Sequence, residues 1–245
     1  MSFPMESSLL LEIAPQPDGS TCGPTCLHAV YRYFGDRVPL EEVVAETGKL
    51  STGGTLAVLL ACHALRRGYR ATIYTYNLRV FDPTWFEKGV DLRAKLRAQA
   101  AVKENAKLRA ATEAYMEFLS LGGRLRFKDL TPKLFRTHLK RQIPVLAGLS
   151  ATYLYGCARE EDDRYDDVRG VPSGHFVVLH GYDRETKTVS VADPLQDNPM
   201  SGARYYRVRI ERILNAILLG ILTYDSNFLV IRPREKRKPA TPSPA

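Results

Sequence analysis

The sequence changes its pattern near residue 142, and this change constrains the fold more than any other feature. Before it, apolar residues recur at helical spacing; after it, short β-branched segments alternate with turn residues. Helices are predicted at 24–34, 38–48, 53–69 and 131–142, with a later one at 211–222. Strands are predicted at 70–76, 143–150, 174–183, 188–194, 203–210 and 227–233. Because the two kinds of element are segregated, the pattern predicts an α+β fold, with N-terminal helices packed on a C-terminal antiparallel sheet.

Residues 1–234 are predicted to form a single domain that contains a helical insertion. The insertion spans about 84–130, where charged and alanine-rich residues carry loosely spaced leucines up to a glycine pair. From residue 235 to 245 the lysines, prolines and small residues cannot build a core, so this tail is predicted to be disordered.

The composition is that of an ordinary globular protein, with 44% apolar and 25% charged residues in 245. The net charge of +8 is diffuse, and no groove-reading motif accompanies it, so no nucleic-acid partner is predicted. No apolar run could span a bilayer, and the first residues lack the basic region of a secretory signal. With only four scattered cysteines, we expect free thiols in a reducing compartment, the cytoplasm, and no membrane partner.

Cys22 lies where a polar loop passes into the helix predicted at 24–34. A thiol is a good nucleophile only as thiolate, and the partial positive charge at a helix N-terminus favours that anion. Gly23 lets a substrate main chain approach, and Pro24 suits a first helical turn. Cys26 lies one turn further in, where burial is expected. Cys22 is therefore the candidate nucleophile, and Cys26 a packing residue.

Other interpretations of the two cysteines remain open. They could bind a metal together with His28 or His63, although the spacing lacks a second matched pair of ligands, and no metal is predicted. They could form a disulfide that closes a very small loop. They could also be two ordinary buried thiols. The nucleophile interpretation therefore depends on partners elsewhere in the chain.

Residues 174–194 contain those partners in a predicted β-hairpin. His175 opens the first strand and Asp193 closes the second, at the same end of the hairpin. If Tyr182 pairs with Thr188, Val177 lies opposite Asp193. His175 and Asp193 are then diagonal neighbours about 7–8 Å apart, which side chains can bridge. A slip of one residue would destroy this relation.

The same register places six residues on one face of the hairpin: His175, Val177, Leu179, Val189, Val191 and Asp193. We expect the apolar ones to pack on the first helix and bring His175 towards Cys22. By parity His180 falls on the opposite face, and it is interpreted as structural.

Gln16, six residues before Cys22, is the candidate oxyanion donor. A side-chain amide near a nucleophile can act with the main-chain N–H of Cys22 to hold a developing oxyanion. A glutamine in a turn does not by itself indicate this role. The cysteine, histidine and aspartate that follow it in this order favour the interpretation as an oxyanion donor.

These residues together resemble a known family. Gln16-Pro17-Asp18 followed by Cys22-Gly23-Pro24-Thr25-Cys26-Leu27 is similar to the signature of bacteriocin-leader-processing (double-glycine) cysteine peptidases. The later "GHFVVLHGYD" and "VADP" resemble that family's histidine and aspartate segments. The resemblance frames residues 14 to about 195 and implies a papain-like fold. This chain lacks the transporter domains to which such peptidases are often fused, and its insertion is extra.

The resemblance implies a cysteine peptidase with Cys22 as nucleophile, His175 as base, Asp193 as orienting residue and Gln16 as oxyanion donor. Gly23 and Gly174, beside the nucleophile and the base, are expected to contact substrate. Such peptidases need no cofactor. The expected partner is a peptide or protein substrate, cleaved at a peptide bond (possibly in a Gly-containing leader) or at an isopeptide bond; the oligomeric state is not predicted.

Two alternatives use the same residues or the same fold. One is a thiol-dependent amidase or acyltransferase, and the other is a peptide-binding module without catalysis. The acidic run at 159–167 has two interpretations as well: a solvated, mobile loop, which is favoured, or a segment that attracts a cation or a basic peptide.

Overall fold

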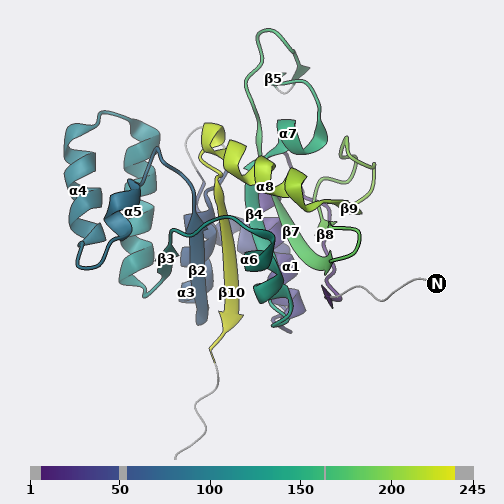
Figure 1. Ribbon diagram of the computed structural model, residues 1–245, viewed down its shortest axis with the longest axis horizontal. Coiled ribbons are helices and arrows are strands. Elements are labelled where there is room, and N and C mark those ends of the chain that lie inside the picture. Colours follow the sequence, from purple (N-terminus) through teal and green to yellow (C-terminus); the bar gives the residue numbers. More distant parts are fainter. Residues whose placement is uncertain (1–6, 50–53, 163, 235–245) are drawn as a thin grey trace, which may run out of the picture.

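The computed structural model describes residues 7–49, 54–162 and 164–234 and consists of helices on both faces of one sheet (Figure 1). The α-helices are α1 (Cys22–Tyr33), α2 (Leu40–Glu46), α3 (Ala57–Arg66), α4 (Leu92–Val102), α5 (Ala106–Ser120), α6 (Pro132–Leu139), α7 (Ala151–Tyr155) and α8 (Ile210–Leu219). Two short 3₁₀ helices are η1 (Pro83–Phe86) and η2 (Gly220–Thr223). No helix in the described ranges is long and apolar enough to cross a membrane.

The main sheet runs in the order β3-β2-β10-β4-β7-β8-β9, and β1 pairs with β7. Its strands are β1 (Ser7–Ser8), β2 (Tyr69–Thr75), β3 (Arg124–Arg126), β4 (Val145–Ser150), β7 (Gly174–Asp183), β8 (Thr188–Ala192), β9 (Tyr205–Arg209) and β10 (Asn227–Pro233). All pairs are antiparallel except β2 with β3. The α+β prediction is confirmed.

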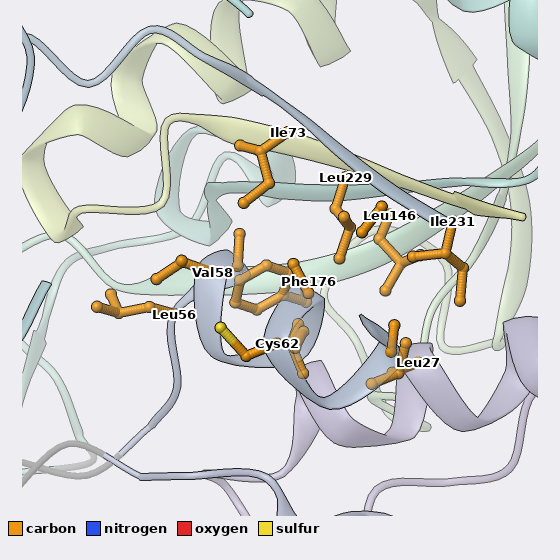
Figure 2. Packing of buried hydrophobic residues seen from close by; sticks show 14 of the residues in the cluster. Leu27, Leu56, Val58, Cys62, Ile73, Leu146, Phe176, Leu229 and Ile231 are labelled. Carbon is orange, nitrogen blue, oxygen red and sulfur yellow. The ribbon is translucent and has the colours of Figure 1, made fainter. Parts of the chain in front are cut away.

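Two apolar clusters lie on opposite faces of this sheet. One contains buried residues of α1, α3 and α5 together with one face of β2, β7 and β10. Figure 2 shows Leu27 of α1, Val58 of α3 and Phe176 of β7 among the residues of this cluster. The other cluster joins α6 and α8 to the opposite face of β4, β7 and β8. The sheet is therefore covered on both faces, which holds α1 firmly against β7.

The predicted elements agree with the structure to within a few residues, except for the short ones. The predicted insertion forms η1, α4 and α5, and it also supplies the edge strand β3, which was not predicted. The sequence pattern also missed β1 and α7. The predicted disordered tail, 235–245, lies outside the described residues.

The β7–β8 hairpin contains a β-bulge that the sequence did not reveal. Next to the turn, Tyr182 pairs with Val189 and not with Thr188, so the predicted register is wrong there by one residue. His180 is the extra residue of the bulge, and beyond it Leu179 pairs with Val191 and Val178 with Ala192. The bulge restores the predicted register at the end of the hairpin that carries His175 and Asp193.

The face prediction for this hairpin is correct in part. Val177, Leu179, Val189 and Val191 do share one cluster. However, they pack against α6 and α8, whereas α1 packs on the opposite face through Phe176 and Val178. The expectation that these residues pack on the first helix is therefore wrong, because α8 returns to cover their face.

The acidic run also has more structure than an irregular loop. Its residues form a small separate sheet of β5 (Glu160–Glu161) and β6 (Arg164–Tyr165). Asp166 accepts hydrogen bonds from the Arg169 side chain and from main-chain N–H groups, which holds its pKa below the usual value. Local arginines thus offset part of the negative charge of this run.

Candidate active site

Cys22 is the first residue of α1, and a tight turn leads into it. Asp18 organises this turn: its carboxylate accepts from the Ser20 N–H at 2.7 Å, and its main-chain N–H donates to the Thr21 hydroxyl at 3.1 Å. The helix then starts with the bond from Thr25 N to Thr21 O. The first N–H groups of a helix have no partner within it, so Cys22 occupies an electropositive end. The structure thus places Cys22, the predicted nucleophile, at the start of a helix.

His175 lies between Cys22 and Asp193. Its Nε2 is 2.8 Å from Asp193 Oδ1, and Cys22 is close enough to the same ring to raise its pKa. Since Nε2 is engaged by Asp193, the contact with Cys22 falls to Nδ1. His175 is 6% exposed and Asp193 is fully buried. The structure thus brings three of the predicted site residues into contact.

The electrostatics of this trio favour a charged histidine. Burial alone would lower the pKa of His175, but the charges of Asp193 and Cys22 outweigh burial and raise the pKa to about 10. Burial would raise the pKa of Asp193, but His175 and the accepted hydrogen bonds hold it below its usual value. At neutral pH the ring is therefore an imidazolium beside a carboxylate.

Two tyrosines fix the carboxylate of Asp193, and the sequence analysis missed both. Tyr155 and Tyr206 each donate their hydroxyl to Asp193 Oδ2 at 2.8 Å, while Oδ1 also accepts from the Leu195 N–H at 2.9 Å. Tyr206 pairs with Val191 across β8 and β9, so it shares the face of Asp193. This register could not be predicted from the sequence, because the connection between the two strands, residues 193–204, is long. Tyr155 comes from α7, which has too few residues to show a period.

Gln16 is joined to this site through its main chain. Its N–H donates to the Pro194 carbonyl at 2.9 Å, directly after Asp193. Its side-chain Nε2 donates to the Asp18 carbonyl at 2.9 Å, while Oε1 is buried without a hydrogen-bond partner in the described part of the chain. The loop containing Gln16 therefore connects the segment before Cys22 with the segment after Asp193.

The two predicted substrate-binding glycines lie in different surroundings. A Cβ on Gly23 would approach the Thr55 methyl group to 2.5 Å and also meet Leu60 and Phe176, so Gly23 has a packing requirement. Gly174 lines the cavity at Cys22 and His175. A Cβ there would overlap the carboxylate of Asp225. Both positions need glycine for close contacts.

A cavity of about 240 Å³ opens beside the trio and adds two charged residues to it. Cys22, His175 and Gly174 line it together with Lys107 and Asp225. Burial raises the pKa of Asp225 to about 7, although Thr223 and Lys107 oppose the rise. Sequence reasoning missed both residues, because nothing in the sequence connects the insertion to residue 225.

The turn that carries Asp225 has an unusual backbone. Tyr224 adopts a left-handed conformation with φ of 72°, which is uncommon for a residue other than glycine. The side chain of Lys107 holds this turn, since its Nζ donates to the Thr223 carbonyl at 3.1 Å and lies 4.9 Å from the centre of the Tyr224 ring. The start of α5 thus supports the wall of the cavity.

The remaining thiols and imidazoles lie outside the trio. Cys26 is fully buried and its thiol contacts the Phe176 carbonyl; burial raises its pKa well above the usual value. All four cysteines are free. His63 contacts Tyr31 and Glu46, and His180 contacts the Leu9 carbonyl. In the described ranges no group of three potential ligands could hold a metal ion.

Comparison with known families gives one match. Residues 108–214 match the model of the Peptidase_C39 like family. This segment resembles a C39-like peptidase. It covers less than half of the chain and includes His175 and Asp193, but neither Cys22 nor Gln16. No curated protein matches the chain.

Several solved structures are similar to the chain at low identity. A double glycine motif protease from an AMS/PCAT transporter, in complex with its leader peptide, is 16% identical over 94% of this chain and 96% of that chain, with a TM-score of 0.47. A C39-like peptidase from Bacillus anthracis is 16% identical over 94% and 100%, with a TM-score of 0.49. Xylellain, a cysteine protease from Xylella fastidiosa, is 14% identical over 96% and 88%, with a TM-score of 0.46. The chemistry of the site therefore has to follow from its own geometry.

Proposed function

We propose that this chain is a papain-like cysteine peptidase that hydrolyses a peptide or isopeptide amide bond. One observation carries the proposal: the buried ring of His175 is 2.8 Å from Asp193 and lines the same cavity as Cys22, which raises the pKa of the ring. A nucleophile, a base and an orienting carboxylate in this order form the arrangement that thiol-dependent acyl chemistry requires. Four free cysteines fit a reducing compartment such as the cytoplasm.

The mechanism starts from an ion pair that exists before the substrate binds. His175 holds the proton that Cys22 gives up, because the raised pKa of its ring stabilises the imidazolium beside the thiolate. The thiolate attacks the carbonyl carbon of the substrate and the carbonyl oxygen becomes an oxyanion. His175 then donates its proton to the leaving amine, which releases an acyl-enzyme. A water molecule, deprotonated by the same ring, hydrolyses the thioester and restores Cys22.

Two donors are assigned to the oxyanion. One is the main-chain N–H of Cys22 at the start of α1, where helical N–H groups lack partners. The other is the second amide hydrogen of Gln16, whose first one is engaged by the Asp18 carbonyl. Gly174 lies at the cavity beside His175 and offers its main chain to the substrate. Gly23 packs too closely against Thr55 to leave room for a side chain.

The decisive experiment is mass spectrometry of a peptide library after incubation with the wild-type protein and with Cys22→Ala. The library includes peptides with glycine pairs, isopeptide-linked peptides, and a free-amine acceptor in a parallel reaction. We expect defined cleavage products with the wild type and with Cys157→Ala, which removes a more exposed thiol, and none with Cys22→Ala. Products that form only with the amine acceptor would establish acyl transfer. Binding without any product from either reaction would establish a peptide-binding module.

Thiol labelling gives a check that needs no substrate. Cys157 is more exposed than Cys22, and burial raises the pKa of Cys157. If His175 activates Cys22, iodoacetamide modifies Cys22 faster at pH 7 despite its lower exposure. A faster reaction at Cys157 contradicts the activated nucleophile.

A further inference from the structure

Arginines surround a second cavity, far from Cys22. This cavity has a volume of about 440 Å³ and is lined by residues of β2, β3, β10 and α6. Figure 1 shows where these elements lie in the fold. Six arginines line it: Arg70, Arg124, Arg126, Arg141, Arg232 and Arg234. No aspartate, glutamate or lysine belongs to its lining. A concave site with a single sign of charge concentrates counter-ions of the opposite sign.

The strand register places the arginines next to one another. Arg70 of β2 lies directly opposite Arg232 of β10. On the other side of β2, Arg124 pairs with Thr72 and Arg126 with Tyr74. Like charges directly opposite each other destabilise a sheet. These arginines therefore raise the free energy of the unliganded fold.

Some arginines elsewhere in this protein are compensated by carboxylates. Arg67 pairs with Asp36, and Arg66 with Glu117. In contrast, within the described ranges none of the six cavity arginines forms an ion pair or a side-chain hydrogen bond. One of these charges acts on a neighbour in the same cavity, His138. Burial lowers the pKa of His138, and the charge of Arg141 lowers it further, to about 4. Six guanidinium groups without a carboxylate partner in the described ranges thus gather around one cavity.

The chemistry of the lining indicates the kind of ligand. Guanidinium groups bind phosphate oxygens in a planar, two-pronged geometry, which a lysine ammonium does not offer. The volume falls in the range of small-molecule sites and is not an extended track for a polymer. We propose that this cavity binds a compact polyphosphate anion, either an inorganic polyphosphate or the triphosphate of a nucleotide.

The cavity is independent of the candidate active site. Asp225 lies in the turn just before β10, and Arg232 lies near the far end of that strand. At about 3.3 Å per residue, Arg232 is roughly 16 Å from Asn227 at the start of the strand. Peptide cleavage and anion binding can therefore succeed or fail separately.

The test is isothermal titration calorimetry of the full chain with sodium tripolyphosphate and with ATP, in 50 mM and 200 mM salt. We expect saturable binding of both anions with one site, at least tenfold weaker in Arg70→Gln/Arg232→Gln. The matched control, Arg97→Gln/Arg184→Gln, loses the same charge at exposed positions elsewhere and keeps its affinity within about twofold. Similar affinities for the two anions would show that the phosphate chain is the recognised group. Tighter binding of ATP would show that the nucleoside also contributes to binding. Arg124→Gln/Arg126→Gln repeats the test from a different strand if the first variant does not fold.

Thermal melting gives a second test, in which the variant and the wild type should change order in their response: the variant is more stable without ligand and is stabilised less by the ligand. Without ligand at low salt, Arg70→Gln/Arg232→Gln should melt several degrees above the wild type, whereas tripolyphosphate should raise the melting temperature of the wild type more than that of the variant. Absence of saturable binding to the wild type, or equal binding to the wild type and both cavity variants, overturns the proposal. Tighter binding of an acidic octapeptide or a single-stranded oligonucleotide in the same salt overturns it as well.

Discussion

His175 and Asp193 are joined by a 2.8 Å contact between Nε2 and Oδ1 in the protein interior, from adjacent strand ends of one hairpin. The contact fixes the ring so that Nδ1 is left for Cys22. It also makes the charge on His175 depend on the carboxylate, because Asp193 is the leading influence that raises the pKa of the ring against the effect of burial. Changes at Asp193 should therefore alter activity and its pH dependence together.

Asp193→Asn keeps the shape of the side chain and removes its charge. We expect kcat/KM to fall about 10²–10⁴-fold, because the ring loses both its orientation and its stabilised imidazolium. In the wild type the alkaline limb of the pH profile should lie near pH 10, and in the variant it should move several units lower. The measurement is kcat/KM from pH 5 to pH 11 on a peptide found by the library screen. An unchanged alkaline limb would show that Asp193 does not control His175.

The stability contribution of His175 has a definite sign. Its pKa in the folded state lies above the ordinary value of 6.5, so the folded state binds the proton more tightly. This stabilisation is fully present below pH 6.5 and is lost as the pH rises towards 10. We expect His175→Gln to lower the urea midpoint more at pH 6 than at pH 10. Equal losses at the two pH values contradict a raised pKa.

Tyr206→Phe removes one of the two hydroxyls that bind Asp193 Oδ2. We expect kcat to decrease about 3–30-fold with little change in KM, because the carboxylate loses a buried hydrogen bond while the substrate loses nothing. Tyr155→Phe should behave alike, since its hydroxyl binds the same oxygen at the same distance. Tyr165→Phe is the matched control, because that side chain is exposed. An effect confined to KM would place these tyrosines in substrate binding.

Asp225→Asn should stabilise the protein at alkaline pH. Burial raises the pKa of this carboxyl to about 7, so the folded state resists its ionisation and loses stability as the pH rises from 4 to 7. The amide removes this loss, and we expect a gain of about 2–4 kcal/mol at pH 8 and almost none at pH 4. Urea unfolding at both pH values measures it.

Lys107→Met provides the opposite change at the same place. It removes the cation that favours the charged form of Asp225, so it should destabilise the protein at pH 8 more than at pH 5. If both variants shift stability equally at all pH values, the carboxyl does not titrate as proposed.

Gly23→Ala tests whether this glycine is needed for packing. Its Cβ would lie 2.5 Å from the Thr55 methyl group, and we expect a loss of about 1–3 kcal/mol in the free energy of unfolding. Thr55→Ser removes that methyl group and keeps the hydroxyl that donates to the Gly48 carbonyl. The double variant should therefore recover part of the loss, which a double-mutant cycle measures. Additive losses would exclude this contact as the cause.

The long elements could be predicted from the sequence because their patterns extend over enough residues. Strand β7 was predicted at its observed bounds, 174–183, since a β-branched run bounded by turn residues defines it. The short elements β1, β3 and α7 have two to five residues each and show no period. The face on which α1 packs could not be predicted either, because it depends on where the distant helix α8 returns.

The site was predictable where chemistry and local position agree. Cys22 at a helix start, and His175 with Asp193 at one end of a hairpin, follow from local patterns. Lys107 and Asp225 come together only because the insertion packs against the turn before β10, and no local pattern records such a contact. Tyr206 depends on the register across a long connection.

The bulge at His180 has a consequence for how the hairpin could vary or be redesigned. It lies between the turn and the end that carries His175 and Asp193. The unpaired residue therefore allows the number of residues in the turn to differ without changing how His175 and Asp193 align. Removal of His180 alone would turn His175 to the other side of the sheet. A compensating change of one residue in the turn would keep the pair aligned. The number of residues between His175 and Asp193 can therefore change, while the pairing of the strand ends cannot.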